Sequence, residues 1–313
     1  MKNLVWIGCA LMVIACQTER PADAAKPALL SLDGKPYYYQ PSSPKALHKL
    51  DSAVAVARQR LAADSSEENF IWLGRRYAYR YQYDSAMLTF DAGLKKYPGS
   101  FKLYRHRGHR HITLRHFDLA AADLESAARL MRGAALETEP DGIPNAINQP
   151  LSSTQFNVWY HLGLAYYLQG NFEQARAAYD SCMRVSINDD LLTATVDWLY
   201  MTHRRLNHKK EAEELLHQIT DKMTIIENES YYRRLRMYQG FLQPEDVLKV
   251  GPGDPDADLS LATQGYGVGN WYLVNGDTVK ALNIYRQVTD GKHFSAFGFI
   301  ASEADLLRLG TNN

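Results

Sequence analysis

The sequence predicts an all-α protein built from repeated pairs of helices. From Ala46 onward, apolar residues recur at intervals of three and four, which places them on one face of an α-helix. Gly74 recurs as Gly108 and Ala86 recurs as Ala120, and both intervals are 34 residues. A fixed period of this length indicates one helix-turn-helix unit that is repeated along the chain.

The N-terminal residues predict export and lipidation. Lys2 precedes an uncharged run from Leu4 to Ala15, which is too short to span a bilayer but has the length of a signal-peptide core. The ending Val13-Ile14-Ala15-Cys16 resembles a lipobox, the pattern recognised by bacterial lipoprotein-processing enzymes. This resemblance implies a signal peptide over 1–15 and acylation of Cys16, which would anchor the chain without a transmembrane helix. An ordinary secretory signal with a chance cysteine is the alternative.

Residues 16–43 are rich in Pro, Ala and short polar residues, which predicts a lipidated N-terminus and a flexible tether. The patch Pro36–Pro41 contains three consecutive tyrosines, and it either docks on the folded body or begins the domain. A single domain is expected over 44–313, and its first helix is predicted from Ala46 to Ala63.

Composition excludes several classes of function. The 35 basic and 35 acidic residues balance, whereas nucleic-acid binders usually carry a strongly basic surface. Cys9 leaves with the signal peptide and Cys16 is expected to carry lipid, so Cys182 has no partner for an intramolecular disulfide. It is predicted to be a buried structural thiol.

One segment identifies the repeat. Trp159-Tyr160-His161-Leu162-Gly163-Leu164-Ala165-Tyr166 fits the pattern W-x2-L-G-x2-Y, and Ala175 and Tyr179 fit A-x3-F with a conservative change. This segment resembles a tetratricopeptide repeat. The resemblance implies a right-handed α-solenoid of about five to six helix pairs, closed by a capping helix from about Ser295 to Leu309. A shortened helix pair is predicted at Tyr231–Gly240 and Pro244–Val250.

The same resemblance implies a partner-binding groove. In this family the first helix of each repeat lines a concave face, and ligand contacts cluster at a few helix positions. Carried over to this sequence, those positions are basic or aromatic and could bind an acidic peptide segment or a carboxylate. Solvated polar positions are the alternative. The groove residues are Arg75, Tyr79, Lys102, Arg105, His106, His109, Asn157, Tyr160 and His161.

The segment 132–155 interrupts the repeat register and contains Glu137, Glu139 and Asp141. Long loops inside compact domains are usually functional or disordered. We hypothesise that this loop folds over the groove and covers the basic patch in the absence of a partner.

Other candidate sites are weaker. His106, His109 and His161 could converge on zinc, but groove histidines without a metal are more common. The segment 254–258 lacks the glycine and the distal glutamate of a calcium loop. The glycines of 265–269 have the wrong spacing for a dinucleotide loop and are expected to let neighbouring backbones pack. We find no catalytic motif, so we expect no enzyme activity, no cofactor and no metal.

The predicted function is a lipid-anchored interaction or scaffold module that binds a protein or peptide partner in the bacterial cell envelope. Gln17, next to the acylated cysteine, favours the outer membrane, in a periplasmic or surface orientation. The alternative is a surface receptor for a glycan or nutrient. Exposed stacked aromatic rings would favour the glycan, and a basic groove with few exposed rings would favour the peptide.

Overall fold

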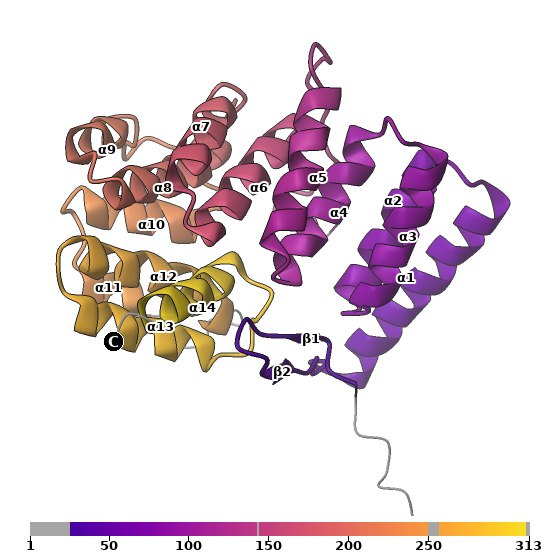
Figure 1. Cartoon of the computed structure of the whole chain (residues 1–313), viewed down its shortest axis with the longest axis horizontal. Coiled ribbons are helices and arrows are strands. Elements are labelled where there is room, and N and C mark those ends of the chain that lie inside the picture. The colour runs from indigo at the N-terminus through magenta and orange to yellow at the C-terminus, as the bar shows by residue number, and fades with distance from the viewer. Residues whose placement is uncertain (1–25, 143, 250–256, 311–313) are drawn as a thin grey trace, which may run out of the picture.

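The computed structural model describes residues 26–142, 144–249 and 257–310. The predicted signal peptide, Cys16 and residues 254–256 lie outside this part of the chain. Within it, fourteen helices and one two-stranded hairpin stack along an arc (Figure 1). The elements are β1 (Leu29–Leu30), β2 (Pro36–Tyr37), α1 (Pro44–Ala63), α2 (Glu67–Tyr79), α3 (Tyr83–Lys96), α4 (Phe101–Thr113), α5 (Phe117–Leu130), α6 (Thr154–Gln169), α7 (Phe172–Met183), α8 (Asp189–Arg205), α9 (Lys209–Leu216), α10 (Glu229–Tyr238), α11 (Pro244–Leu248), α12 (Ala257–Val274), α13 (Thr278–Thr289) and α14 (Phe297–Gly310).

Consecutive helices pack in pairs, as the repeat period predicts. The pairs are α2 with α3, α4 with α5, α6 with α7, α8 with α9, and α12 with α13 (Figure 1). The first four pairs also pack on one another in chain order. The shortened pair is present as α10 and α11, and α14 packs against α12 and α13 at the C-terminal end. The predicted all-α solenoid of helix pairs with a capping helix is therefore confirmed.

A glycine allows the two helices of a pair to approach closely. A Cβ atom on Gly163 of α6 would lie 2.6 Å from the Tyr179 ring of α7, and one on Gly74 of α2 would lie 2.3 Å from the Phe90 ring of α3. The α12–α13 pair repeats this arrangement. A larger side chain at these positions would overlap the facing ring, so the large residues pack inside each pair as well as between pairs.

The glycines of 265–269 accommodate side chains and not the neighbouring backbone that we expected. A Cβ atom on Gly267 would lie 2.0 Å from the Arg234 Nε atom, and one on Gly265 would lie 2.6 Å from the Val288 side chain. Arg234 forms a 2.7 Å ion pair with Asp197, and both side chains are fully buried. Burial raises the pKa of Asp197 to about 7, although the charge of Arg234 opposes this shift. The small residues of α12 thus make room for a buried ion pair.

The turns within five helix pairs each contain one residue with left-handed backbone. Gly170 and Gly276 provide it after α6 and α12, with φ of 83° and 93°. Tyr81, Arg115 and Asn207 provide it after α2, α4 and α8, with φ of 58°, 66° and 61°. This conformation costs a residue with a Cβ atom roughly 1–2 kcal/mol. A tyrosine or an arginine at such a position indicates that contacts elsewhere hold it there.

Tyr81 contacts the N-terminal segment, and Arg115 contacts both that segment and α14. The Tyr39 ring stacks on the Tyr81 ring with centroids 4.2 Å apart. The Arg115 guanidinium lies 5.6 Å from the centroid of the Tyr37 ring and forms a buried 2.7 Å ion pair with Glu303 of α14. The two strained turns therefore connect the first repeats to both ends of the described chain.

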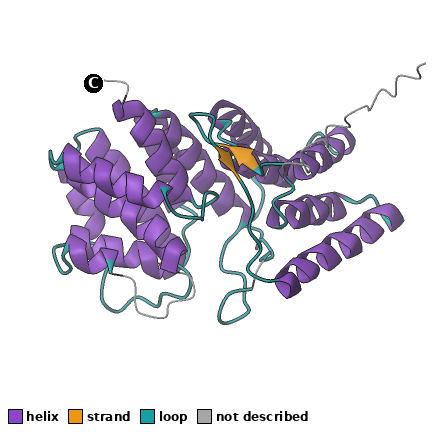
Figure 2. Ribbon diagram, turned by 90° about the horizontal axis from the view of Figure 1, so that it is seen from below, coloured by secondary structure: helices purple, strands orange, loops and turns teal. Residues whose placement is uncertain are grey.

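Residues 26–43 do not form the flexible tether that their composition predicts. Their hairpin lies between the N-terminal and C-terminal helices (Figures 1 and 2). The Tyr37 ring stacks on the Phe294 ring with centroids 5.2 Å apart, and the Leu32 amide donates a hydrogen bond to Glu303 at 2.5 Å. Composition suggests a tether, but the rings of Tyr37 and Tyr39 dock this segment on the folded body.

The concave side of the arc is filled by the chain itself. The helix α14 packs against α6, and the Phe297 ring lies 5.4 Å from the His109 ring and 5.5 Å from the His161 ring, measured between centroids. The extended open concave surface that the resemblance implied is therefore not formed.

Candidate functional site

The helices α2, α4 and α6 bring the predicted groove residues together. Arg75 and Tyr79 come from α2, and they lie beside Arg105, His106 and His109 of α4. Asn157, Tyr160 and His161 lie on α6, where the His161 ring packs 4.3 Å from the His109 ring. We call this surface of α2, α4 and α6 the floor.

The loop 132–153, of which residue 143 is not described, crosses the floor and ends where α6 begins, and we call it the strap. Its acidic segment, residues 137–142, contacts the predicted basic residues directly. Glu139 forms a 2.8 Å ion pair with Arg105, and Glu137 forms a 2.5 Å ion pair with Lys102 at the edge of the floor. The structure thus agrees with the hypothesis that this acidic loop covers the basic patch.

Two arginines of α2 bind the backbone of the strap. The Arg75 guanidinium donates to the Pro140 carbonyl at 2.9 Å, and the Arg76 guanidinium donates to the Gly142 carbonyl at 3.2 Å. A Cβ atom on Gly142 would lie 1.5 Å from the Tyr79 hydroxyl, so only glycine allows the strap to lie this close. The floor therefore recognises both the charge and the extended backbone of the acidic segment.

The strap is also held at its ends by backbone pairing. The Glu139 amide donates to the Ser152 carbonyl at 2.9 Å, and the Thr154 amide donates to the Glu137 carbonyl at 2.8 Å. The Asn157 side-chain amide donates to the Ser152 hydroxyl at 2.9 Å. Asn157 thus positions the strap and is not open to an external ligand.

Most floor residues are buried under the strap and α14. Arg75, Arg105, His106 and His161 each expose less than a tenth of their surface. Tyr160 is buried as well, and its hydroxyl donates to the Tyr231 hydroxyl of α10 at 3.1 Å. A partner can reach these side chains only after the strap moves.

The three histidines lie in a basic environment. Burial lowers the pKa of His106, His109 and His161 well below its ordinary value, and nearby arginines lower it further. One Arg105 nitrogen lies 3.0 Å from the His106 Nδ1 atom and 3.5 Å from that of His109. A guanidinium at this point would repel a zinc ion. No group of three or more metal-ligating side chains is placed to hold a metal within the described residues.

Sequence reasoning missed Arg110, which lines the floor beside Arg75, Arg105 and His109. It lies one residue after His109 on α4, outside the positions carried over from the repeat family. Its burial against α2 depends on the packing of the two helices, which the spacing alone does not give.

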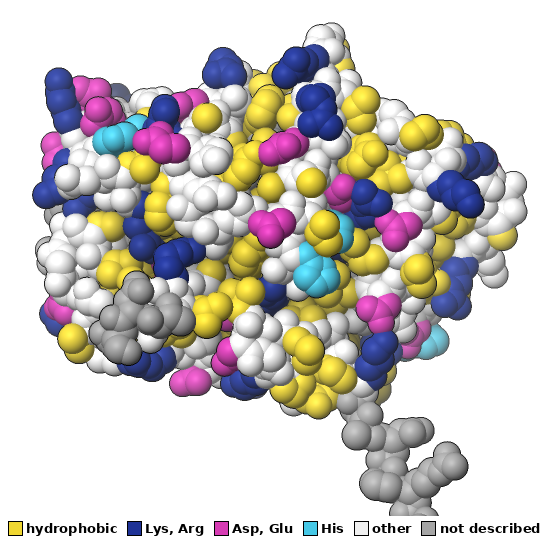
Figure 3. Space-filling view, in the orientation of Figure 1, with side chains coloured by type: hydrophobic (Ala, Val, Ile, Leu, Met, Phe, Trp, Pro, Cys, Tyr) yellow, Lys and Arg dark blue, Asp and Glu magenta, His cyan; other side chains and the backbone are white. Residues whose placement is uncertain are grey.

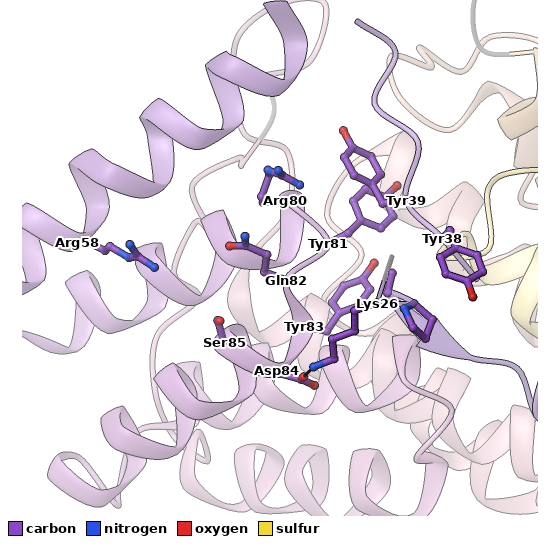
Figure 4. Close-up of a pocket in the computed structure, with 12 residues that line it drawn as sticks. Lys26, Tyr38, Tyr39, Arg58, Arg80, Tyr81, Gln82, Tyr83, Asp84 and Ser85 are labelled. Carbon is purple, nitrogen blue, oxygen red and sulfur yellow. Dashed lines mark hydrogen bonds and ion pairs between the residues drawn. The ribbon is translucent and has the colours of Figure 1, made fainter. Parts of the chain in front are cut away.

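Away from the floor, a cavity of about 400 Å³ lies between α1, the α2–α3 turn and the N-terminal segment (Figure 4). Tyrosine rings line it, with the exposed Tyr38 on one side and the stacked pair of Tyr39 and Tyr81 on the other. Arg58 and Gln82 add polar groups to its wall. The sequence analysis singled out the tyrosine patch but not this cavity.

Cys182 is a buried structural thiol, as predicted. It is fully buried on α7, and its sulfur lies 3.4 Å from the Thr195 hydroxyl of α8. Burial raises the pKa of this thiol to about 12, which keeps it protonated and unreactive.

Charges of both signs are interspersed on the face shown in Figure 3. None of the helices in the described ranges combines the length and the apolar character needed to cross a membrane.

The fold and the floor define a helical-repeat protein, and one comparison identifies the type of repeat. A family model for the tetratricopeptide repeat matches residues 156–189, which contain most of α6 and all of α7. The match supports the resemblance at this helix pair, and other consecutive helices of the described chain pack in pairs as α6 and α7 do.

Comparison with whole proteins adds little. A solved structure of MamA AMB-1 is similar over 55% of this chain and 88% of that chain, with 19% sequence identity and a TM-score of 0.41. A similarity of this size carries no argument, so the fold assignment rests on the helix pairs themselves. No curated protein matches the sequence.

Proposed function

We propose that this protein is a lipid-anchored interaction module of the bacterial envelope, and that its strap occupies the floor until a protein partner displaces it. The observation that carries this proposal is the buried ion pair between Arg105 of the floor and Glu139 of the strap. Surface loops normally keep their carboxylates in water, because removing a charge from water is costly. Glu139 instead occupies the position where a partner's carboxylate would bind.

The strap indicates what kind of partner the floor accepts. Its acidic segment is extended and places carboxylates against Lys102 and Arg105, while Arg75 and Arg76 bind carbonyl oxygens. Carbonyl contacts do not depend on side-chain identity, so the charges must provide the selectivity. The proposed partner is therefore a protein with an extended acidic segment that carries a small residue where Gly142 meets Tyr79.

Lipid anchoring at Cys16 is the second part of the proposal. The lipobox-like residues 13–16 support it. The outer membrane is the proposed location. Replacing Cys16 with serine should abolish incorporation of labelled palmitate and release the protein from the membrane fraction. A wild-type protein that incorporates no palmitate would contradict this part alone.

Capture of partners from solubilised envelope tests the proposed groove. We compare the wild-type protein with a Glu137→Lys, Glu139→Lys variant, in which the strap is repelled from the floor. The third protein is an Arg105→Glu, His109→Glu variant, in which two acidic side chains are added to the floor and the charge of Arg105 is lost. We expect the strap variant to retain more of a specific acidic protein and the floor variant to retain none. Equal retention by all three would contradict the proposal.

A receptor for a glycan remains a second candidate because of the tyrosine-lined cavity. Tyr38 is 47% exposed there, and the stacked rings of Tyr39 and Tyr81 lie opposite it. Sugars stack their C–H faces on such rings and bond their hydroxyls to polar groups such as Gln82 and Arg58. If this candidate is correct, a glycan array should yield a ligand that the wild type binds and a Tyr38→Ala variant does not.

A further inference from the structure

A small cavity of about 100 Å³ lies beneath the strap, between α2 and α4. Arg75, Arg105, Arg110, His106, His109 and Glu139 line it. Water occupies about 30 Å³ per molecule in the liquid, so this space has room for about three waters or one ion of similar total size. The cavity is therefore large enough to hold a small ligand against the three arginines.

The cavity has an excess of positive charge. Arg105 forms an ion pair with Glu139, and this is the one carboxylate that lines the cavity. Arg75 uses its guanidinium for the Pro140 carbonyl and for the Tyr79 hydroxyl at 3.4 Å, both of which are neutral. Neither Arg75 nor Arg110 forms an ion pair in the described part of the chain. The Asp141 carboxylate acts on Arg75 from outside the cavity, whereas Arg110 is partly buried and has no nearby carboxylate on the cavity wall except Glu139. Arginine cannot lose its proton, so a positive charge remains in the cavity.

Arg110 is the least satisfied of the three arginines. Burial lowers its pKa, and the groups that oppose this shift are the phenols of Tyr79, Tyr81 and Tyr83. A phenol remains neutral near pH 7, so it does not balance the arginine charge. No carboxylate in the described ranges forms an ion pair with Arg110, and its guanidinium is free to contact an anion in the cavity.

Two buried polar atoms of the cavity lining also lack partners. The Arg105 Nε–H has no acceptor, and the Glu139 Oε2 atom has no donor, among the described protein groups. Arg105 and Glu139 each expose only 7% of their surface. Leaving such a buried group unpaired is unfavourable, because it has lost its hydrogen bonds to water. The missing partner must therefore accept a hydrogen bond from an arginine and donate one to a carboxylate.

We infer that the cavity binds a tetrahedral oxyanion that carries a proton, namely phosphate in its hydrogenphosphate or dihydrogenphosphate form. Its unprotonated oxygens accept hydrogen bonds from the forked guanidinium groups of Arg75, Arg105 and Arg110, which match phosphate geometry. Its P–OH group donates to the Glu139 Oε2 atom. Sulfate has similar size but no proton near pH 7, so it would be repelled by the Glu139 carboxylate.

Water is the competing occupant of the cavity. Water and phosphate differ in charge, and only phosphate can balance the arginines. Water molecules could bond to the Arg105 Nε–H and to the Glu139 Oε2 atom, but they would leave the Arg110 charge unbalanced. Phosphate satisfies both polar atoms and balances the arginines. Because the ion would touch floor and strap together, it would help to hold the strap closed.

This inference rests on the cavity and does not depend on the proposed partner. It is tested with the full-length chain in detergent, using phosphate, sulfate and chloride at matched ionic strength. Isothermal titration calorimetry and thermal unfolding are the two measurements. We expect saturable binding of one phosphate per chain with a rise in Tm, because a ligand that binds only the folded state stabilises it. Sulfate should bind at least about tenfold more weakly, since one hydrogen bond to a charged group contributes about 1.5–3 kcal/mol.

Three variants make the test specific. Arg110→Gln should weaken phosphate binding at least about tenfold. The control Arg129→Gln, on the exposed face of α5, should leave binding unchanged. Glu139→Gln should remove the preference for phosphate over sulfate, because the carboxylate that repels sulfate is gone. It should also weaken the binding of both anions, because the strap is then held less firmly over the cavity. If Arg110→Gln does not fold, Arg110→Lys replaces it, because lysine keeps the charge but loses the forked geometry.

Two results would overturn the inference. One is an equal Tm change in all three salts, which would indicate a general ionic effect and a cavity filled with water. The other is phosphate binding that Arg110→Gln and Arg110→Lys leave unchanged, which would locate the anion elsewhere. Neither result bears on partner capture, so a failure here is distinguishable from a failure of the proposed function.

Discussion

Arg105 of α4 and Glu139 of the strap form a 2.8 Å ion pair in which each side chain exposes only 8% of its surface. The second strap pair, Lys102 with Glu137, is similarly short but far more exposed, at 29% and 50%. Burial increases what is lost when one partner is removed, because the remaining charge stays out of water. The two pairs should therefore contribute very differently to strap closure.

Replacing Glu139 with glutamine should destabilise the closed strap by about 3 kcal/mol, because Arg105 loses its counter-charge in a buried position. Replacing Glu137 with glutamine should cost about 1 kcal/mol or less, since that pair is exposed to solvent. Hydrogen exchange of the amides in 132–153 measures strap opening in both variants. Similar exchange rates in the two variants would show that burial of the Glu139 pair does not control the strap.

Replacing Gly163 with alanine should destabilise the fold by about 1–3 kcal/mol. The added Cβ atom would lie 2.6 Å from the Tyr179 ring, so the helix pair must separate. This loss opposes the gain of about 1 kcal/mol that alanine brings in a helix. Urea unfolding measures the difference. Gly99→Ala is the control, because its Cβ would meet no atom within 4 Å. A Gly163→Ala protein as stable as the wild type would contradict this packing.

Stability should fall as the pH decreases below about 6.5, the ordinary pKa of histidine. Asp197, whose pKa burial raises to about 7, opposes this trend as one group against three histidines. Burial lowers the pKa of His106, His109 and His161 in the folded protein, so they stay neutral while the unfolded chain binds protons. The unfolded state then binds more protons than the native state, and each histidine removes up to about 1.4 kcal/mol per pH unit from the free energy of unfolding.

The pH effect is measured as the free energy of unfolding at pH 7.5 and pH 5.5. We expect His109→Gln to reduce the pH dependence, because one of the three groups no longer titrates. The exposed His48 of α1 provides the control, and His48→Gln should leave the dependence unchanged. An unaltered dependence in the His109 variant would show that this histidine is protonated equally in both states.

Substitutions of two neighbouring tyrosines test whether the N-terminal segment docks on the folded body. Tyr37 takes part in docking, whereas Tyr38 lines the tyrosine-lined cavity with an exposed ring. Tyr37→Ala removes the stack on Phe294 and the contact with Arg115, so it should cost about 2 kcal/mol and release the hairpin. Tyr38→Ala should change stability by about 0.5 kcal/mol or less, since its ring is 47% exposed. Urea unfolding and proteolysis within residues 26–43 test both. Equal effects of the two substitutions would contradict the docked hairpin.

The helix pairs are predictable from the sequence because the residues that pack within a pair lie close together along the chain. Gly163 and Tyr179 lie within one repeat, and their spacing recurs at Gly74 and Phe90. The left-handed turn residue Tyr81 was missed, because its conformation is held by Tyr39, which is distant in sequence. The sequence also gave no sign that α14 would return to α6, since that contact depends on the curvature of the whole stack.

The candidate site was predictable in part. Arg75, Arg105 and His109 were chosen from repeat positions, and the structure brings them to one surface. The acidic strap was expected over that surface from its charge alone. What the sequence could not give is the degree of burial, because Pro140 and Glu139 reach the floor through backbone pairing with residues 152–154.

Binding of the acidic segment in trans tests the central claim most directly. A fluorescent peptide with the sequence of residues 134–145 is titrated into the wild type, into a Glu137→Gln, Glu139→Gln variant, and into that variant with Arg105→Glu added. The wild type should bind weakly, because its own strap competes at high effective concentration. The strap variant should show saturable binding, and the added Arg105→Glu should abolish it. A strap variant that binds no peptide, or binds it equally well with Glu at position 105, would contradict the claim that the floor is a site for acidic segments.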